Sequence, residues 1–155
     1  MVDTILQISV LGCLVQVASI DLQSFEVPSA TVLLLAISGV ILTWRVAPDL
    51  LVLHLLAAFA WSALFAMVLR GHRHLRGTDG LGWGDVKLIF GIALWLGWSG
   101  TVWCVLAAAL SGAAVQAVRL VRGHERANAS VPGALPFAPF LCLGAAGVWV
   151  PGIAP

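Results

Sequence analysis

A carboxylate behind three glycines at alternate positions is the part of this sequence best suited to chemistry. The stretch GLGWGDVKL covers residues 80–88, and an almost wholly apolar run over 86–98 overlaps its end. An ionisable group at the threshold of a membrane helix is costly and therefore usually functional. Glycine also allows a close approach that no larger residue tolerates. We therefore single out Asp85, and we pair it with Asp21, which ends an earlier apolar run.

Composition defines the class of protein that holds these acids. The 155 residues are 61% hydrophobic and only 10% charged, whereas a soluble domain carries roughly 25% charged residues. We expect an all-α integral membrane protein with a single membrane-embedded domain over residues 1–155. The net charge of +1 gives no argument for a nucleic-acid partner.

Six apolar runs are candidate membrane spans, and a full span needs about 20 residues. Pro28 opens the second run, and proline is tolerated at a helix start. A polar stretch over 70–80 separates the third run from the short fourth run, which begins near Trp83 or places Asp85 below the membrane surface. The sequence thus predicts a bundle of about six transmembrane helices, at residues 5–20, 29–44, 50–69, 86–98, 100–121 and 136–150.

The distribution of basic residues predicts which side the acids face. With six spans, the connections around 21–28, 70–85 and 122–135 share one side of the membrane. Seven of the eight Lys and Arg residues fall there, and only Arg45 falls on the other side. The positive-inside rule makes the first side cytoplasmic. Asp21 and Asp85 are then both at the cytoplasmic face, and the N-terminus is outside.

Two such acids are able to carry out hydrolysis without a metal or an organic cofactor. Carboxylates held close cannot both ionise cheaply, so the pair shares a proton and acts as base and acid together. One draws a proton from water, which attacks a peptide carbonyl, and the other donates a proton to the developing oxyanion. Which aspartate is base and which is acid stays open. On the residue pattern alone, two solvated acids that cap helix ends are an equally good interpretation.

Three segments in this order resemble the motifs of the type IV prepilin peptidases, which are membrane-embedded aspartic proteases. GLGWGDVKL is similar to their glycine-x-glycine-aspartate motif. DLQSFEVP (21–28) resembles their second hallmark, an aspartate followed by polar residues and an aliphatic-proline pair. PFAPFL (136–141) resembles the proline-phenylalanine motif that opens their last helix. Together these segments span nearly the whole chain.

The resemblance implies that Asp21 and Asp85 are the catalytic pair, supported by motif residues Gly82, Gly84, Lys87 and Pro28. It implies an endopeptidase of a bacterial inner membrane that removes the short leader from type IV prepilins or from pilin-like subunits of protein secretion. Its partners would be that substrate and membrane lipid. Ser29 and Ala138 depart from the family pattern, in which asparagine or aspartate and then glycine are usual at these positions.

The resemblance also bears on a second activity. Larger members of the family carry an N-terminal region with cysteine pairs and methylate the new N-terminus. Here about twenty residues precede Asp21, and Cys13, Cys104 and Cys142 are isolated within apolar runs. We therefore expect the compact, peptidase-only form without methyltransferase activity, and buried packing roles for the three cysteines.

Other assignments compete with this one. A proton-coupled transporter would use the same acids as a relay, although such sites usually lie near the bilayer midplane and between repeats. A non-catalytic scaffold for pilus or secretion assembly would need neither acid. A presenilin-like or signal-peptide-peptidase-like enzyme shares the glycine-aspartate motif, but it pairs that motif with a tyrosine-aspartate sequence, and this chain contains no tyrosine.

Several polar residues receive plainer interpretations. Asp79 is the main rival acid, and its Gly-Thr-Asp-Gly context suits a turn. His72 and His74 lack a companion ligand at metal-binding spacing, so a solvated loop is expected there. His54, inside a span, is expected to form an interhelical hydrogen bond. Trp83, between the motif glycines, either shapes the site or anchors the helix at the interface.

Overall fold

The described part of the chain is almost entirely helical. The structure is a computed structural model, and it describes residues 2–24, 27–76, 82–121 and 136–149. This described part contains five α-helices: α1 (Val2–Ser24), α2 (Ser29–Val46), α3 (Leu51–Arg76), α4 (Trp83–Val121) and α5 (Ala138–Trp149). A short 3-10 helix, η1 (Pro48–Leu50), lies between α2 and α3. The all-α class is confirmed. The single domain over residues 1–155 stays a prediction.

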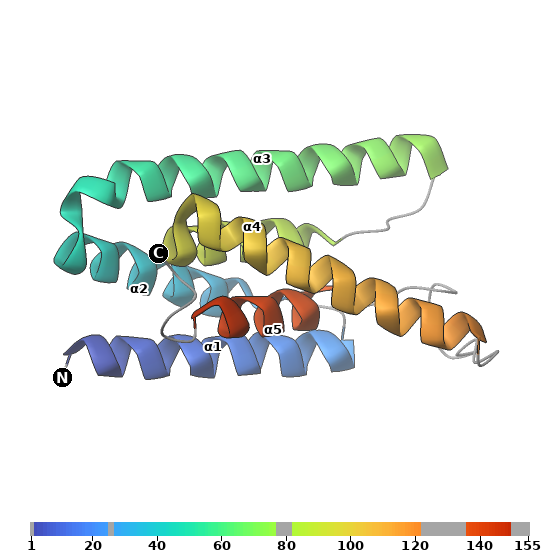
Figure 1. Cartoon of the computed structure of the whole chain (residues 1–155), viewed down its shortest axis with the longest axis horizontal. Coiled ribbons are helices and arrows are strands. Elements are labelled where there is room, and N and C mark those ends of the chain that lie inside the picture. The colour runs from blue at the N-terminus through green and yellow to red at the C-terminus, as the bar shows by residue number, and fades with distance from the viewer. Residues whose placement is uncertain (1, 25–26, 77–81, 122–135, 150–155) are drawn as a thin grey trace.

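The helix count differs from the prediction. The described residues contain five α-helices and not six, because α4 covers the residues of both the predicted fourth and fifth spans. Gly97 interrupts this long helix with φ 64° and ψ −162°, a conformation that is essentially restricted to glycine. Figure 1 shows the chain running along α4 in one direction, reversing, and returning in the other. The reversal lies two residues before Ser99, the predicted boundary between the two spans.

Three of the described helical segments are long and apolar enough to cross a membrane. They lie at Ser29–Val46, Pro48–His74 and Trp83–Arg119. α5 is apolar but shorter, with 12 residues. Two boundaries correct the predictions: α1 continues past Asp21 to Ser24, and α3 continues past Leu69 to Arg76. His72 and His74 therefore lie on a helix and not in a loop.

The buried core takes residues from all five helices, and α1 and α4 each contribute a regular stripe to it. Val10, Leu14 and Val17 are buried on α1, and Asp21 continues their spacing at the next turn. On α4, Ile89, Ile92 and Leu96 continue the stripe that Asp85 begins, and Leu96 is packed against the same core. Positions three or four apart share one face of a helix, so each aspartate lies on the buried face of its own helix.

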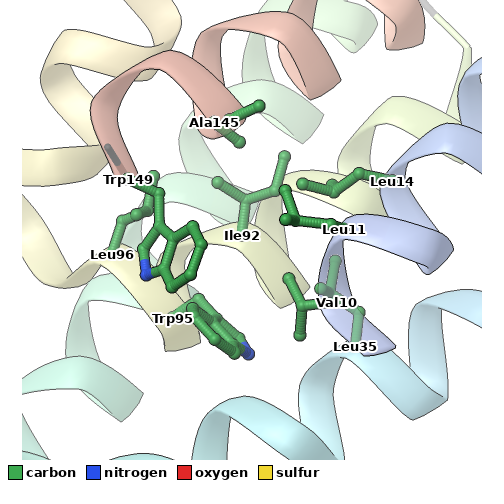
Figure 2. A pocket seen from close by; sticks show the side chains of 10 residues that line it. Val10, Leu11, Leu14, Leu35, Ile92, Trp95, Leu96, Ala145 and Trp149 are labelled. Carbon is green, nitrogen blue, oxygen red and sulfur yellow. The ribbon is translucent and has the colours of Figure 1, made fainter. Parts of the chain in front are cut away.

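An apolar pocket marks the middle of this core. Figure 2 shows side chains from α1, α2, α4 and α5 converging on it, among them Val10, Leu14 and Ile92. Trp95 and Trp149 pack edge to face there, with ring centroids 5.7 Å apart. The pocket holds only about 10 Å³, so the side chains nearly fill it.

The break in α4 is held by polar side chains from two other helices. A non-helical residue leaves carbonyl groups of the preceding turn without their intrahelical donors. His54 Nδ1 donates to the Leu94 carbonyl oxygen over 2.9 Å, and Thr43 Oγ1 donates to the same oxygen over 3.5 Å. The predicted interhelical role of His54 is confirmed. These bonds connect α2 and α3 to the reversal in α4.

Candidate active site

Asp21 and Asp85 line the same cavity at one end of the bundle. The cavity measures about 260 Å³, and its wall is formed by Asp21, Val27, Gly82, Trp83, Gly84, Asp85 and Lys87. Figure 1 shows that α1 and α3 end, and α4 begins, at the end of the molecule opposite the N-terminus. Both aspartates are buried, with exposed fractions of 5% and 6%. The structure thus brings together two acids that are 64 positions apart in the sequence.

The first turn of α4 holds Asp85 in place. Gly82 precedes the helix, and its backbone N–H donates to Asp85 Oδ2 over 3.1 Å. The Asp85 N–H in turn donates to the Gly82 carbonyl oxygen over 3.1 Å. This is the backward half of a capping box, in which the third helical residue satisfies the amide before the helix. A carboxylate is also favoured here because a helix N-terminus carries a partial positive charge.

Asp21 lies in the last turn of α1 and faces the start of α5. The backbone N–H of Ala138, the first residue of α5, interacts with its carboxylate. Because Ala138 is the first residue of this helix, its amide has no intrahelical acceptor, while the Phe137 carbonyl oxygen before it accepts from the Phe140 and Leu141 amides. The proline-phenylalanine segment therefore starts α5 where its first amide, that of Ala138, interacts with the Asp21 carboxylate.

One oxygen of Asp21 is left without a partner. Among the described residues, Asp21 Oδ2 is buried and forms no hydrogen bond. A buried polar atom without a partner costs free energy, and native structures rarely tolerate one without a reason. The two carboxyl groups also act on each other electrostatically. An unpaired oxygen beside a second carboxyl group is suited to hold a shared proton or a water molecule.

Close packing behind the site requires a glycine at residue 84. A Cβ atom there would lie 2.6 Å from Val27 Cγ2 and 2.8 Å from Val27 Cβ. Pro28 follows Val27 and caps the N-terminus of α2 in an extended conformation. At Gly82 an added Cβ would meet only ordinary contacts, the nearest at 3.6 Å from Asp85 Oδ2. Of the two motif glycines, Gly84 is the one that the packing demands.

Two cation contacts define the rim of the cavity. The Arg70 guanidinium lies 5.7 Å from the centre of the Trp83 ring, which is 52% exposed. On the other side, Lys87 Nζ donates to Ser29 Oγ over 3.2 Å, joining the first turn of α4 to the first residue of α2. Trp83 is one of the residues that line the cavity. This agrees with the first of its two predicted roles, which is to shape the site.

The remaining candidates lie away from the cavity or outside the described residues. Cys104 and Cys142 are buried as predicted, and Cys13 is partly buried. Asp79 falls in 77–81, outside the described residues. In the part of the chain that the structure describes, no group of three or more His, Cys, Asp or Glu residues is placed to hold a metal ion.

Three contacts at the site were not predicted from the sequence. They are the packing of Val27 against Gly84, the hydrogen bond between Ser29 and Lys87, and the approach of the Ala138 amide to Asp21. The motif segments contain all of these residues except Ser29, which directly follows the second segment. Each contact joins residues far apart in the sequence, and no spacing rule within one segment reports such a contact.

Comparison of the sequence with known proteins identifies the family of this chain. A sequence profile described as the type IV leader peptidase family matches residues 8–117, which include both aspartates and the glycines between them. The chain belongs to the type IV leader peptidase family.

Individual relatives extend this assignment. A prepilin leader peptidase/N-methyltransferase of Burkholderia pseudomallei is 42% identical over 88 residues, covering 57% of this chain and 26% of that protein. The leader peptidase HopD of Escherichia coli is 37% identical over 105 residues, covering 67% of this chain and 65% of HopD. This chain thus spans about a quarter of the first relative and just under two thirds of the second. No solved structure matches it.

Proposed function

We propose that this chain is a membrane aspartic endopeptidase that removes the leader peptide from type IV prepilins or pilin-like subunits. The observation that carries the proposal is the placement of Asp21 and Asp85 on one cavity, both buried and at one end of the bundle. Membership of the leader peptidase family and the names of the relatives supply the substrate class.

The proposed reaction uses the two carboxyl groups and one water molecule. One carboxylate takes a proton from the water as its oxygen attacks the scissile carbonyl carbon, while the other carboxyl group gives a proton to the carbonyl oxygen. The tetrahedral intermediate then collapses and the C–N bond breaks. The leaving amine takes the proton from the carboxyl group that acted as base, and a hydroxyl group of the intermediate returns a proton to the other carboxylate as the new carboxyl group forms. The unpaired Oδ2 of Asp21 suits this exchange, because it offers a place for the transferred proton.

We place the reaction at the cytoplasmic face of a bacterial inner membrane, with the N-terminus outside. The argument combines the positive-inside rule with the position of the acids at the end where α1 and α3 finish. Reporter fusions test this arrangement. An alkaline phosphatase fused after Asp49 is expected to be active, and the same enzyme fused after Arg76 is expected to be inactive. The opposite pattern would reverse the topology.

Substitution of each acid tests the proposed catalysis. The unchanged chain, Asp21→Asn and Asp85→Asn are co-expressed with a panel of type IV prepilins, and leader removal is followed by gel shift. Asp49→Asn is a matched control, because Asp49 is an exposed acid in η1 at the other end of the molecule. We expect processing by the unchanged chain and by the control alone. Processing at the wild-type rate by either site variant would show that the dyad is not required.

Mass spectrometry of the product tests whether the protein cleaves its substrate without methylating the new N-terminus. HopD, the relative of which this chain covers 65%, is named a leader peptidase alone. For residues 1–155 we therefore propose cleavage without methyl transfer. The new N-terminus is expected to carry no added methyl group when the purified protein is supplied with S-adenosylmethionine. A methylated product would overturn this part of the proposal.

A further inference from the structure

Among the described residues that line the cavity, Lys87 is the only cation. The other six lining residues are two aspartates, two glycines, a valine and a tryptophan. Lys87 is exposed, whereas its neighbours Val86 and Leu88 are buried. Because it follows Asp85 by two positions, it leaves the helix in a different direction, and its long side chain reaches the rim and not the floor.

The ammonium group at this rim is held by a neutral partner. Lys87 Nζ donates to Ser29 Oγ over 3.2 Å, and among the described residues no ion pair joins it to either aspartate. An ammonium group has three N–H donors, so two remain after the bond to Ser29. The charge is thus oriented beside the acids without being neutralised by them.

A peptide entering this cavity needs donors of this kind. Each residue of an extended substrate brings a carbonyl oxygen that must find a donor once it leaves water. The backbone N–H of Gly82 is already used by Asp85 Oδ2, and the aspartates offer acceptors when ionised. The Trp83 indole and the first amides of α4 are neutral donors, whereas Lys87 offers a charged donor, which binds an oxygen more strongly.

We propose that Lys87, oriented by Ser29, is a substrate-positioning residue that donates to a carbonyl or carboxylate oxygen of the bound peptide. This inference rests on the proposed function, since the peptide is the substrate of that reaction. It also assigns a role to Ser29, the first residue of α2. Here a hydroxyl orients the lysine and leaves its charge available.

A kinetic comparison in neutral detergent tests the inference. The substrate is a prepilin that the unchanged chain cleaves, and the variants are Lys87→Met, Lys87→Arg, Ser29→Ala and the double variant Lys87→Met/Ser29→Ala. We expect Lys87→Met to raise KM by about tenfold with little change in kcat, the size expected for one charge-assisted hydrogen bond. Lys87→Arg should recover most of that loss, and Ser29→Ala should raise KM by a smaller factor.

The double variant separates positioning from independent effects. If Ser29 acts only through Lys87, the double variant has the KM of Lys87→Met alone. Additive losses would show that Ser29 acts by itself and would overturn its role as the orienting residue. An unchanged KM for Lys87→Met would overturn the inference as a whole. A loss in kcat alone would do the same, because it would indicate an effect on the acids and not on binding.

Anionic phospholipid is the competing partner for a lysine at a membrane boundary. Arg73, an exposed cation near the end of α3, provides the matched control as Arg73→Met. The KM defect of Lys87→Met is expected in neutral detergent, where Arg73→Met behaves as wild type. A defect seen only in vesicles with anionic lipid, and shared by both variants, would assign Lys87 to lipid. Absence of cleavage by the unchanged chain would instead overturn the proposed function and this inference with it.

Discussion

Two cavities on the same helices differ in what they are able to do. The acid cavity of about 260 Å³ takes Asp21 from α1 and Asp85 from α4. The apolar pocket of about 10 Å³ takes Leu14 from α1 and Ile92 from α4, each seven positions from the corresponding aspartate. Seven residues make about two helical turns, so one buried stripe on each helix serves both cavities.

The difference between them follows from position along the helices. Along a helix the backbone groups pair with one another, so apolar side chains fill the space around the apolar pocket. At the end of the bundle, the starts of α4 and α5 present unpaired amides, which meet Asp85 and Asp21. Chemistry is possible at the helix ends because polar partners are available there.

The sharpest contrast compares Asp21→Asn with Leu14→Ala, two turns apart on one face of α1. Asp21→Asn should lower the cleavage rate by about 10³-fold with little loss of stability, since it removes acid–base function. Leu14→Ala should lower the free energy of unfolding by about 2–5 kcal/mol yet leave cleavage per folded molecule near wild type. Gel-shift rates and thermal unfolding in detergent measure both. Equal loss of activity in the two variants would remove the distinction between the cavities.

The two motif glycines allow a second contrast within the acid cavity. Gly84→Ala places a Cβ against Val27 and should cost about 1–3 kcal/mol, seen as a loss of at least tenfold in cleavage. Gly82→Ala meets only ordinary contacts and should stay within about threefold of wild type, since less than 1 kcal/mol is at stake. Comparable losses from both substitutions would mean that packing against Val27 is not what Gly84 provides.

The break in α4 at Gly97 is expected to affect stability and not chemistry. Gly97→Ala combines a glycine-only conformation with a clash against the His54 ring, and it should lower the free energy of unfolding by about 1–3 kcal/mol. Gly12→Ala is the control: Gly12 is helical, nothing lies within 4 Å of its added Cβ, and the change should be neutral or slightly stabilising. Thermal unfolding in detergent measures both. If Gly97→Ala left the free energy of unfolding unchanged, the glycine-only conformation and the contact with His54 would be contradicted.

The smallest effect is expected at the Trp83 side of the rim. Arg70→Gln removes a cation from the exposed face of Trp83, an interaction of about 0.5–1 kcal/mol. Cleavage should fall by about two- to fivefold, because Trp83 keeps its position on the wall and loses only its partner. Prepilin titrations measure the change. A loss as large as that of Asp21→Asn would place Arg70 in the reaction itself.

The sequence by itself determined much of this protein. Hydrophobic content determined an all-α chain able to cross a membrane, and three motif segments determined the family. Local rules also predicted where α2 begins, because proline is tolerated at a helix start and not in its middle. For α4 they left two alternatives, and the structure has the start at Trp83. The end of α3 was missed, since the basic residues after Leu69 are equally compatible with a helix and a loop.

Only the tertiary structure decided how these pieces meet. It placed Asp21 and Asp85 on one cavity, Val27 against Gly84, and Ser29 beneath the Lys87 ammonium. It also put the reversal of α4 at Gly97, where His54 and Thr43 bind the Leu94 carbonyl oxygen. Periodicity reports the face on which a residue lies, but it does not report which other helix packs against that face. That pairing depends on side-chain volumes across the whole bundle, and a spacing rule along one segment does not contain them.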